Sequence, residues 1–138
     1  MTERQKPVLT NLELEVMQVV WASGPDPVTV RDVVEHLNQD RQKKLAYNTV
    51  QTMLVILRDK GVVRDRKGPG RAHAWSPTVS RDDVSSSMVG DLVDRLFEGK
   101  VEPLLHHLVE HERLDRLELA ELRRLIDKEL DDEAEGPR

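Results

Sequence analysis

Two capping boxes, each followed by an apolar stripe, begin helices within the first 30 residues. In segment 10–13 (TNLE) the Thr10 hydroxyl can accept from the Glu13 amide, while the Glu13 carboxylate reaches back to the Thr10 amide. Segment 29–32 (TVRD) repeats this start. Apolar residues at helical spacing predict helices that run to about residues 22 and 38. Neither helix can bury much surface alone, so both must pack against a further element.

A third helix and a β-hairpin follow. Segment 46–60 has an apolar stripe, and Gly61 is well placed to end the helix. Segments 62–67 and 72–75 are predicted strands on either side of the turn at 68–70 (GPG). Three helices and a hairpin, in this order, predict a winged helix-turn-helix domain over residues 8–77.

The chain after Pro77 is predicted to be helical, over about 80–98, 101–111 and 115–130. Three short amphipathic helices do not easily form a core of their own, so their stripes must pack either on the N-terminal domain or on a second copy of the chain. The difference in charge between the two parts and the linker at Pro77 favour a second copy. We therefore expect a three-helix dimerisation domain over 80–131 and a flexible acidic tail over 132–138. The fold class is mainly α with a small β-hairpin wing. The residues expected in the dimer interface are Val84, Met88, Leu92, Leu96, Leu104, Leu105, Leu108, Leu119, Leu122 and Ile126.

The net charge of −5 hides an asymmetry along the chain. Residues 1–77 carry 12 Lys and Arg against 9 Asp and Glu, whereas residues 78–138 carry 9 against 17. A basic part joined to an acidic part favours a polyanion-binding domain with a second domain of different purpose. An ordinary solvated basic face is the alternative explanation of the charge alone.

Several classes of protein are excluded or disfavoured. The chain has no cysteine, which rules out disulfides, thiolate metal sites and cysteine nucleophiles. No apolar run approaches the roughly 20 residues of a membrane helix, and the N-terminus lacks the apolar stretch of a signal peptide. We therefore expect a cytoplasmic protein with no membrane partner.

The third predicted helix carries the candidate DNA-reading residues. Val50, Leu54 and Leu57 should face the core, which turns Asn48, Gln51 and Thr52 outward. Asn and Gln can each bond an adenine edge, and a Thr methyl can contact thymine. A merely solvated helix face is the alternative, but position on the third helix of this unit favours base reading. The residues expected to contact the DNA backbone, from the helix or the wing, are Lys43, Lys44, Tyr47, Arg58, Lys60, Arg64, Arg66, Lys67 and Arg71.

One cluster is suggestive of a metal site, and none is suggestive of catalysis. His107 and His111 are four residues apart, beside His106, so one helical turn can present two imidazoles to a metal. Ordinary polar side chains near a dimer interface are the favoured explanation, because no further ligand is evident. No phosphate-binding glycine loop and no nucleophile with a base at meaningful spacing is present, so we predict neither an enzyme nor a cofactor.

Five segments, in order, resemble the penicillinase-repressor (BlaI/MecI) family: 12–21 (LELEVMQVVW), 30–33 (VRDV), 46–54 (AYNTVQTML), 60–63 (KGVV) and 70–73 (GRAH). The resemblance implies a homodimer that binds a palindromic operator and represses β-lactamase or related stress and resistance genes. It also implies base reading by Asn48, Thr49, Gln51 and Thr52.

The resemblance further suggests a sensor-protease as a partner, since the best-known members are cleaved in the dimerisation domain. The cleaved position corresponds to His107-Leu108, where this sequence departs from the Asn-Phe pair of those members. A competing hypothesis is a winged-helix module whose basic face binds an acidic protein and has no specific DNA target.

Overall fold

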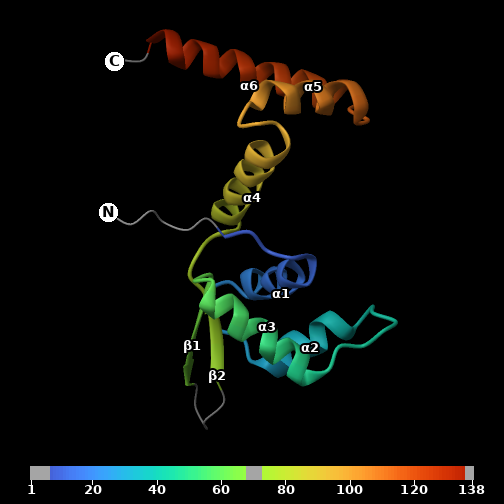
Figure 1. Cartoon of the computed structure of the whole chain (residues 1–138), viewed down its shortest axis with the longest axis vertical. Helices are drawn as coiled ribbons and strands as arrows, with labels where there is room; N and C mark the ends of the chain where they lie inside the picture. Colours follow the sequence, from blue (N-terminus) through green and yellow to red (C-terminus); the bar gives the residue numbers. More distant parts are fainter. Residues whose placement is uncertain (1–6, 68–72, 136–138) are drawn as a thin grey trace. The chain divides into compact units, whose positions relative to one another are not determined.

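The structure, a computed structural model, describes residues 7–67 and 73–135. Its first part contains α1 (Asn11–Ala22), α2 (Val30–Asn38), α3 (Tyr47–Asp59) and the antiparallel strands β1 (Val63–Lys67) and β2 (His73–Pro77) (Figure 1). This element order confirms the predicted winged helix-turn-helix. The turn between the strands, with Gly68, Pro69, Gly70 and Arg71, lies outside the described residues.

Local signals in the sequence account for the helix ends. Both predicted capping boxes form, with Glu13 N 3.2 Å from Thr10 Oγ1 and Asp32 N 3.1 Å from Thr29 Oγ1. Gly61 follows α3 with φ of 83°, a conformation that favours glycine because a Cβ is crowded there. The chain then turns back, and Val62 N donates to the carbonyl of Leu57 at 3.0 Å.

The hairpin is attached to the helices through a short bridge as well as through packing. β1 and β2 pair from Val63 with Pro77 to Lys67 with His73. Val28, in the loop before α2, exchanges two backbone hydrogen bonds with Trp75, at 2.9 and 2.7 Å. The wing is therefore held beside the start of α2.

One hydrophobic core joins all these elements. The fully buried side chains of α1, α2 and α3 meet there, and Trp75 of β2 is 3% exposed. The buried members of the core cluster are Leu9, Val16, Met17, Val19, Val20, Val28, Val30, Val33, Val50, Leu54, Leu57, Val62, Val63, Trp75 and Val84.

The boundary between the two compact units differs from the predicted one. The sequence predicted a division at residues 77–80, but the units divide between Leu92 and Val93, inside α4 (Arg81–Leu96). The reason is that Val84 is buried in the winged-helix core and Met88 packs against it. The first turns of α4 therefore belong to the first unit.

The second unit contains the end of α4, α5 (Val101–His111) and α6 (Arg116–Glu135). A capping box begins α6, because Asp115 and Glu118 bond each other's amides at 2.8 and 3.0 Å. The helix runs to Glu135, so the prediction of a flexible tail from residue 132 is wrong for 132–135, while 136–138 lie outside the described residues. Good helix formers continue there, and Lys128 Nζ lies 3.9 Å from Asp132 Oδ2, one turn on.

Within the described residues, no helix is both long enough and apolar enough to span a bilayer.

Candidate nucleic-acid interface

Helix α3 has one buried face and one exposed face. Val50, Leu54 and Leu57 are fully buried and fix the rotation of the helix on the core. The side chains that this rotation leaves in solvent include all four predicted base-reading residues: Asn48, Thr49, Gln51 and Thr52. Their amide and hydroxyl groups can donate to and accept from base edges. They cluster in the first two turns, the part of a recognition helix that contacts bases.

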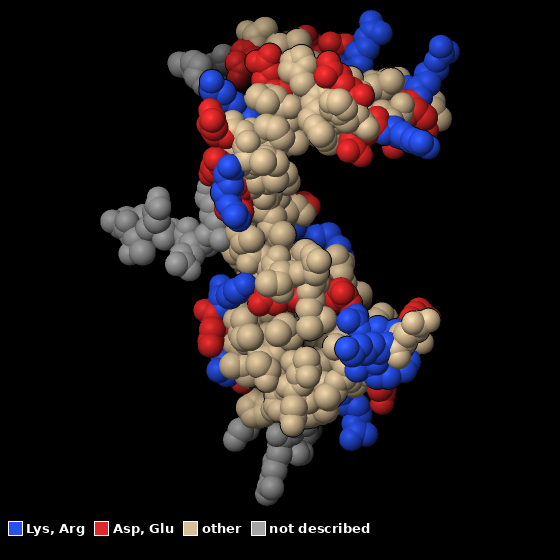
Figure 2. All heavy atoms as spheres, turned by 45° about the vertical axis from the view of Figure 1, so that its right-hand side comes forward, with Lys and Arg blue, Asp and Glu red and all other residues tan. Residues whose placement is uncertain are grey.

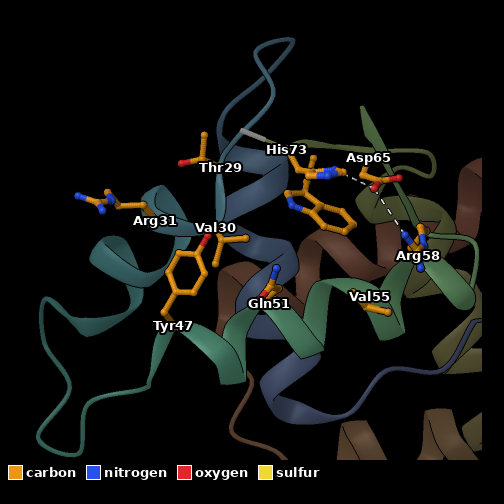
Figure 3. A pocket seen from close by; sticks show the side chains of 10 residues that line it. Thr29, Val30, Arg31, Tyr47, Gln51, Val55, Arg58, Asp65 and His73 are labelled. Atoms are coloured by element: carbon orange, nitrogen blue, oxygen red, sulfur yellow. Dashed lines mark hydrogen bonds and ion pairs between the residues drawn. The ribbon is translucent and has the colours of Figure 1, made fainter. Parts of the chain in front are cut away.

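A recess of about 690 Å³ adjoins this exposed face (Figure 3). Tyr47 and Gln51 of α3 line it together with Thr29 and Arg31 at the start of α2; its other lining residues are Val30, Val55, Arg58, Asp65, His73 and Trp75. Sequence reasoning missed Thr29 and Arg31 as interface candidates. Their place at a helix start was the available signal, because the helix dipole there attracts phosphate.

An acidic residue holds two basic side chains on the wing side of the recess. Asp65 of β1 lies 3.2 Å from His73 Nδ1 and 3.5 Å from Arg58 Nη1, through the same Oδ2 atom (Figure 3). Arg58 also lies 3.7 Å from Asp59. The predicted phosphate contact Arg58 is thus oriented by carboxylates before any DNA arrives.

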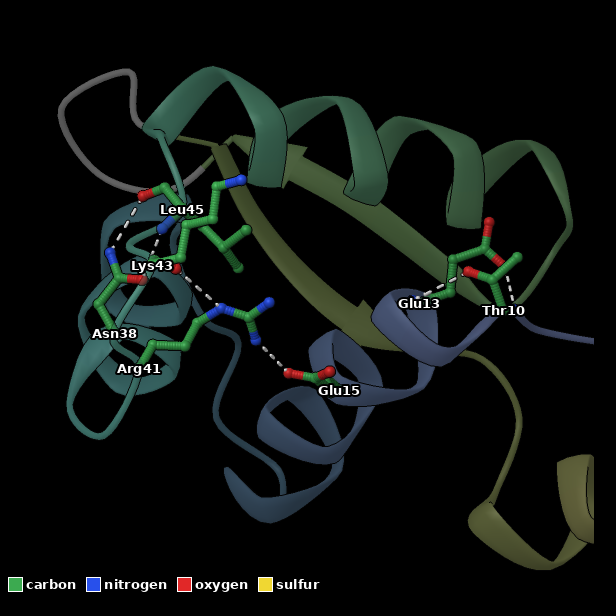
Figure 4. A network of polar contacts seen from close by, with 7 residues as sticks. All are labelled: Thr10, Glu13, Glu15, Asn38, Arg41, Lys43 and Leu45. Atoms are coloured by element: carbon green, nitrogen blue, oxygen red, sulfur yellow. Dashed lines mark hydrogen bonds and ion pairs between the residues drawn. The ribbon is translucent and has the colours of Figure 1, made fainter.

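The connector between α2 and α3 is pinned by side-chain bonds rather than left free (Figure 4). The Asn38 side chain donates to and accepts from the backbone of Leu45, at 3.0 and 2.8 Å. Arg41 reaches α1, where Nη1 lies 2.6 Å from Glu15 Oε1. Lys44 Nζ donates to the Asn38 carbonyl at 2.6 Å. These bonds set where α3 begins, and they engage Lys44 within the protein.

Lys60 has a structural partner that the sequence did not reveal. Its Nζ lies 2.8 Å from Glu13 Oε1 and 3.1 Å from the Val8 carbonyl oxygen. Burial of Glu13 acts to raise the pKa of its carboxyl, but the hydrogen bonds from Lys60 and Thr10 outweigh it and hold that pKa below its ordinary value. We therefore remove Lys60 from the proposed phosphate contacts and assign it to the anchoring of α1.

Other predicted backbone contacts are exposed. Lys43, Arg64 and Arg66 lie in solvent, and Tyr47 is about half exposed. Figure 2 shows Lys and Arg side chains gathered on one side of the first unit, around the connector between α2 and α3. The Lys67 side chain and Arg71 lie outside the described part of the chain.

The predicted dimer residues divide into two groups. Val84 is 2% exposed within the winged-helix core, so its assignment to a dimer interface is wrong. Met88 is partly buried against the same core. Leu104 is half-buried. The others are exposed large hydrophobic side chains: Leu92, Leu96, Leu105, Leu108, Leu119, Leu122 and Ile126. Exposed apolar side chains on successive helices are typical of a surface that another chain covers.

A family model described as "Penicillinase repressor" matches residues 9–128, which include both units. The chain belongs to the penicillinase-repressor family. Membership makes it a DNA-binding transcriptional regulator rather than an enzyme.

Curated relatives of this family member are similar over nearly their whole length. The penicillinase repressor of Bacillus licheniformis is 25% identical over 122 residues, which are 88% of this chain and 91% of the relative. The methicillin resistance regulatory protein MecI of Staphylococcus aureus (strain N315) is 24% identical over 120 residues, 87% of this chain and 94% of the relative. Among solved structures, a mutant of S. aureus MepR bound to an oligodeoxyribonucleotide shares the fold, with a TM-score of 0.51, 17% identity and coverage of 90% of this chain and 79% of that chain.

The pair His107-Leu108, which the family resemblance predicted to correspond to a cleaved bond, is helical here. His107 and Leu108 lie inside α5, and Leu108 accepts a hydrogen bond from the Glu112 amide at 3.2 Å. The rings of His107 and His111 are 4.8 Å apart, and His106 Nε2 lies 3.5 Å from Glu102. Within the described residues, no three His, Cys, Asp or Glu side chains are arranged to hold a metal ion.

Proposed function

We propose that this penicillinase-repressor family member acts as a homodimer on a palindromic operator and represses β-lactamase or related resistance genes. Each winged helix would place α3 in the major groove of one half-site. The observation that carries the proposal is the pair of faces on α3, with Val50, Leu54 and Leu57 buried and the polar residues near its start exposed.

Base reading is assigned to Asn48, Thr49, Gln51 and Thr52, and backbone contact to basic residues around them. Arg31 and Thr29 join the backbone set because they line the recess beside Gln51. Arg58 approaches the backbone from the far end of α3, and Arg64 and Arg66 from the wing. The division follows from chemistry, since bidentate amides discriminate bases while guanidinium groups on phosphates do not.

Dimerisation is assigned to exposed apolar residues of the second unit. Leu119, Leu122 and Ile126 of α6 and Leu105 and Leu108 of α5 are at least 37% exposed. Covering such side chains contributes roughly 25 cal/mol for each Å² of apolar surface removed from water. Two copies related by a two-fold axis match the two-fold symmetry of a palindromic operator. The regulated genes are assigned from the relatives, which are named as a penicillinase repressor and a methicillin resistance regulator.

The test begins with duplexes that the full chain selects from a random pool. Gln51→Ala should weaken binding to the selected duplex by about 1–3 kcal/mol and change binding to random DNA little. Arg66→Ala should weaken both about equally and reduce the slope of affinity against salt by about one. Gel shifts over a salt series measure both quantities.

Three outcomes would contradict parts of this proposal. Selection without an enriched sequence would favour a module that binds an acidic protein. Enrichment of single rather than paired half-sites would remove the palindrome. Equal loss on selected and random DNA for Gln51→Ala would remove that residue from base reading.

A further inference from the structure

The segment between the wing and α4 is attached to the winged helix at several successive residues. The Thr78 amide donates to the Val62 carbonyl at 2.9 Å, and the Thr78 hydroxyl to the Gly61 carbonyl at 2.5 Å. One residue later, the Val79 carbonyl accepts from the Trp21 indole, with Nε1 2.9 Å away. The chain that leaves the wing therefore follows the end of α1 rather than swinging free.

Arg81, the first residue of α4, makes a second contact with α1. Its guanidinium carbon lies 5.1 Å from the centre of the Trp21 ring, within the range of cation–π attraction. The same guanidinium donates to Gln18 Oε1. We call the four residues Gln18, Trp21, Val79 and Arg81 the α4 latch.

The latch holds the start of α4 against α1, and side-chain packing holds the next turns of α4 against the winged-helix core. Ser80 and Asp83 bond each other's amides at 3.0 Å, which starts the helix next to the latch. One turn further, Val84 is 2% exposed in the winged-helix core, and Met88 packs on that core. The direction in which α4 leaves the core is thus fixed at its first residue and again over its next two turns.

We propose that the α4 latch sets the half-site spacing that the dimer accepts. The proposal rests on the proposed function, since it requires a dimer and an operator with two half-sites. Helix α4 runs without a break from Arg81 to Leu96, past the division at Leu92. The chain passes from each winged helix to the proposed dimerising residues along this helix, so the latch is the joint that holds the reading face to the start of α4.

A firm joint and a loose joint predict different binding profiles. One inserted base pair rotates the second half-site by about 34° and moves it by about 3.4 Å, since a turn of DNA holds about 10.5 base pairs. If the two reading faces are held firmly, the second winged helix can then no longer bind its half-site, and most of the affinity gained from bivalent binding is lost. If the two reading faces are held loosely, the effective concentration of the second winged helix at its half-site is lower at the best spacing, but affinity falls less when the spacing changes.

The experiment compares three forms of the full chain on a series of duplexes. The duplexes carry the half-sites selected from a random pool, with the central spacer shortened or lengthened by one and two base pairs. The proteins are the wild type, the double variant Trp21→Phe with Arg81→Ala, and Ser23→Ala. Ser23→Ala is the matched control, because it removes a side-chain hydrogen bond at the same end of α1 whose acceptor is the Val19 carbonyl and not a latch residue.

We expect wild type and Ser23→Ala to lose at least about tenfold in affinity when the spacer changes by two base pairs. The double variant should bind the selected duplex more weakly, and lose less than about threefold with the same change. If the double variant does not fold, Trp21→Phe alone is compared on the same duplexes, because it keeps an aromatic ring packed against the core and loses the hydrogen bond to the Val79 carbonyl. Equal spacing profiles for variant and wild type would overturn the latch and leave the proposed function standing. Selection that yields no paired half-sites would overturn both.

Discussion

Glu13 has two roles, one within α1 and one between α1 and α3. It closes the capping box of α1 through Thr10, and the same Oε1 atom accepts from Lys60 at the end of α3. Its side chain is only 5% exposed, so the carboxylate depends on these donors in place of water. Lys60, at the end of α3, therefore anchors α1.

Replacing Lys60 with Met should lower the free energy of unfolding. The change leaves a buried carboxylate without its cation, and we expect a cost of about 1–3 kcal/mol at neutral pH. The figure stays at this level because a third of the Lys60 side chain is in solvent. Urea unfolding followed by circular dichroism measures it. The salt slope of DNA binding should not change, whereas a slope reduced by about one would return Lys60 to the phosphate contacts.

The cost of this substitution should shrink in acid. The lowered pKa of Glu13 contributes stability that is complete above the ordinary value of 4.5 and is lost as the pH falls through the folded-state pKa. Without Lys60, the carboxyl of Glu13 keeps its burial but loses a hydrogen bond and a positive charge that offset it, so its folded-state pKa should be higher than in the wild type. We therefore expect the difference in free energy of unfolding between the wild type and Lys60→Met to be smaller at about pH 4 than at about pH 7. A difference that is the same or larger at the lower pH would mean that the substitution acts by removing packing contacts of the Lys60 side chain and not by removing its charge.

The contrast between Thr10 and Lys60 marks what a sequence reveals about single residues. The bond of Thr10 to Glu13 spans three positions, and the capping-box spacing alone predicts it. The bond of Lys60 to Glu13 spans 47 positions and depends on how α1 crosses α3. The spacing of two residues in the sequence does not reveal such a pair, so a lysine near predicted DNA-contacting residues was itself predicted to bind phosphate.

At the scale of elements, an apolar stripe predicts a helix and its buried face, but not the neighbour that covers it. The stripe of α3 was assigned correctly, because Val50, Leu54 and Leu57 have one core available. The stripe of α4 was assigned to a dimer, yet Val84 and Met88 cover the winged helix. The pattern is the same in both helices, and only the three-dimensional arrangement separates the two partners.

Helix α6 offers a direct test of the remaining stripe. Leu122→Asp together with Ile126→Asp would bury two carboxylates in the proposed dimer, at a cost of several kcal/mol. Both side chains are exposed in the single chain, at 37% and 55%, so helix content should be retained. We expect the dissociation constant to rise by at least about a thousandfold, measured by sedimentation.

A lysine version of the same double substitution separates burial from net charge. Residues 78–138 are already acidic, so added aspartates also increase repulsion between copies. Leu122→Lys with Ile126→Lys reduces that repulsion but still buries charge. Both variants should be monomeric at micromolar concentration; a lysine variant that stays dimeric would assign the effect to repulsion and leave these residues outside the interface.

At the scale of the whole molecule, the charge asymmetry fits a division of labour. The first 77 residues are basic and carry the candidate interface, while the acidic remainder is repelled by phosphates and so is suited to join copies rather than to touch DNA. One winged helix contacts few base pairs and has modest specificity by itself. Under the proposed function, affinity for the operator therefore depends on residues that make no DNA contact.

Two fragments test this dependence and the boundary at once. A fragment ending at Leu92 keeps the α4 latch, Val84 and Met88, and should fold as a monomer. A fragment ending at Ser80 loses the burial of Val84, worth about 1.5–3 kcal/mol, and should be less stable by at least that amount. Thermal unfolding compares the stability of the two fragments.

The same fragments test operator binding. Because neither fragment retains α5 and α6, both should bind the selected operator about 100-fold to 10,000-fold more weakly than the full chain at equal salt. If the fragment ending at Leu92 bound the operator as tightly as the full chain, the acidic helices would not be needed to hold two winged helices together. The proposed dependence of operator affinity on dimerisation would then be wrong.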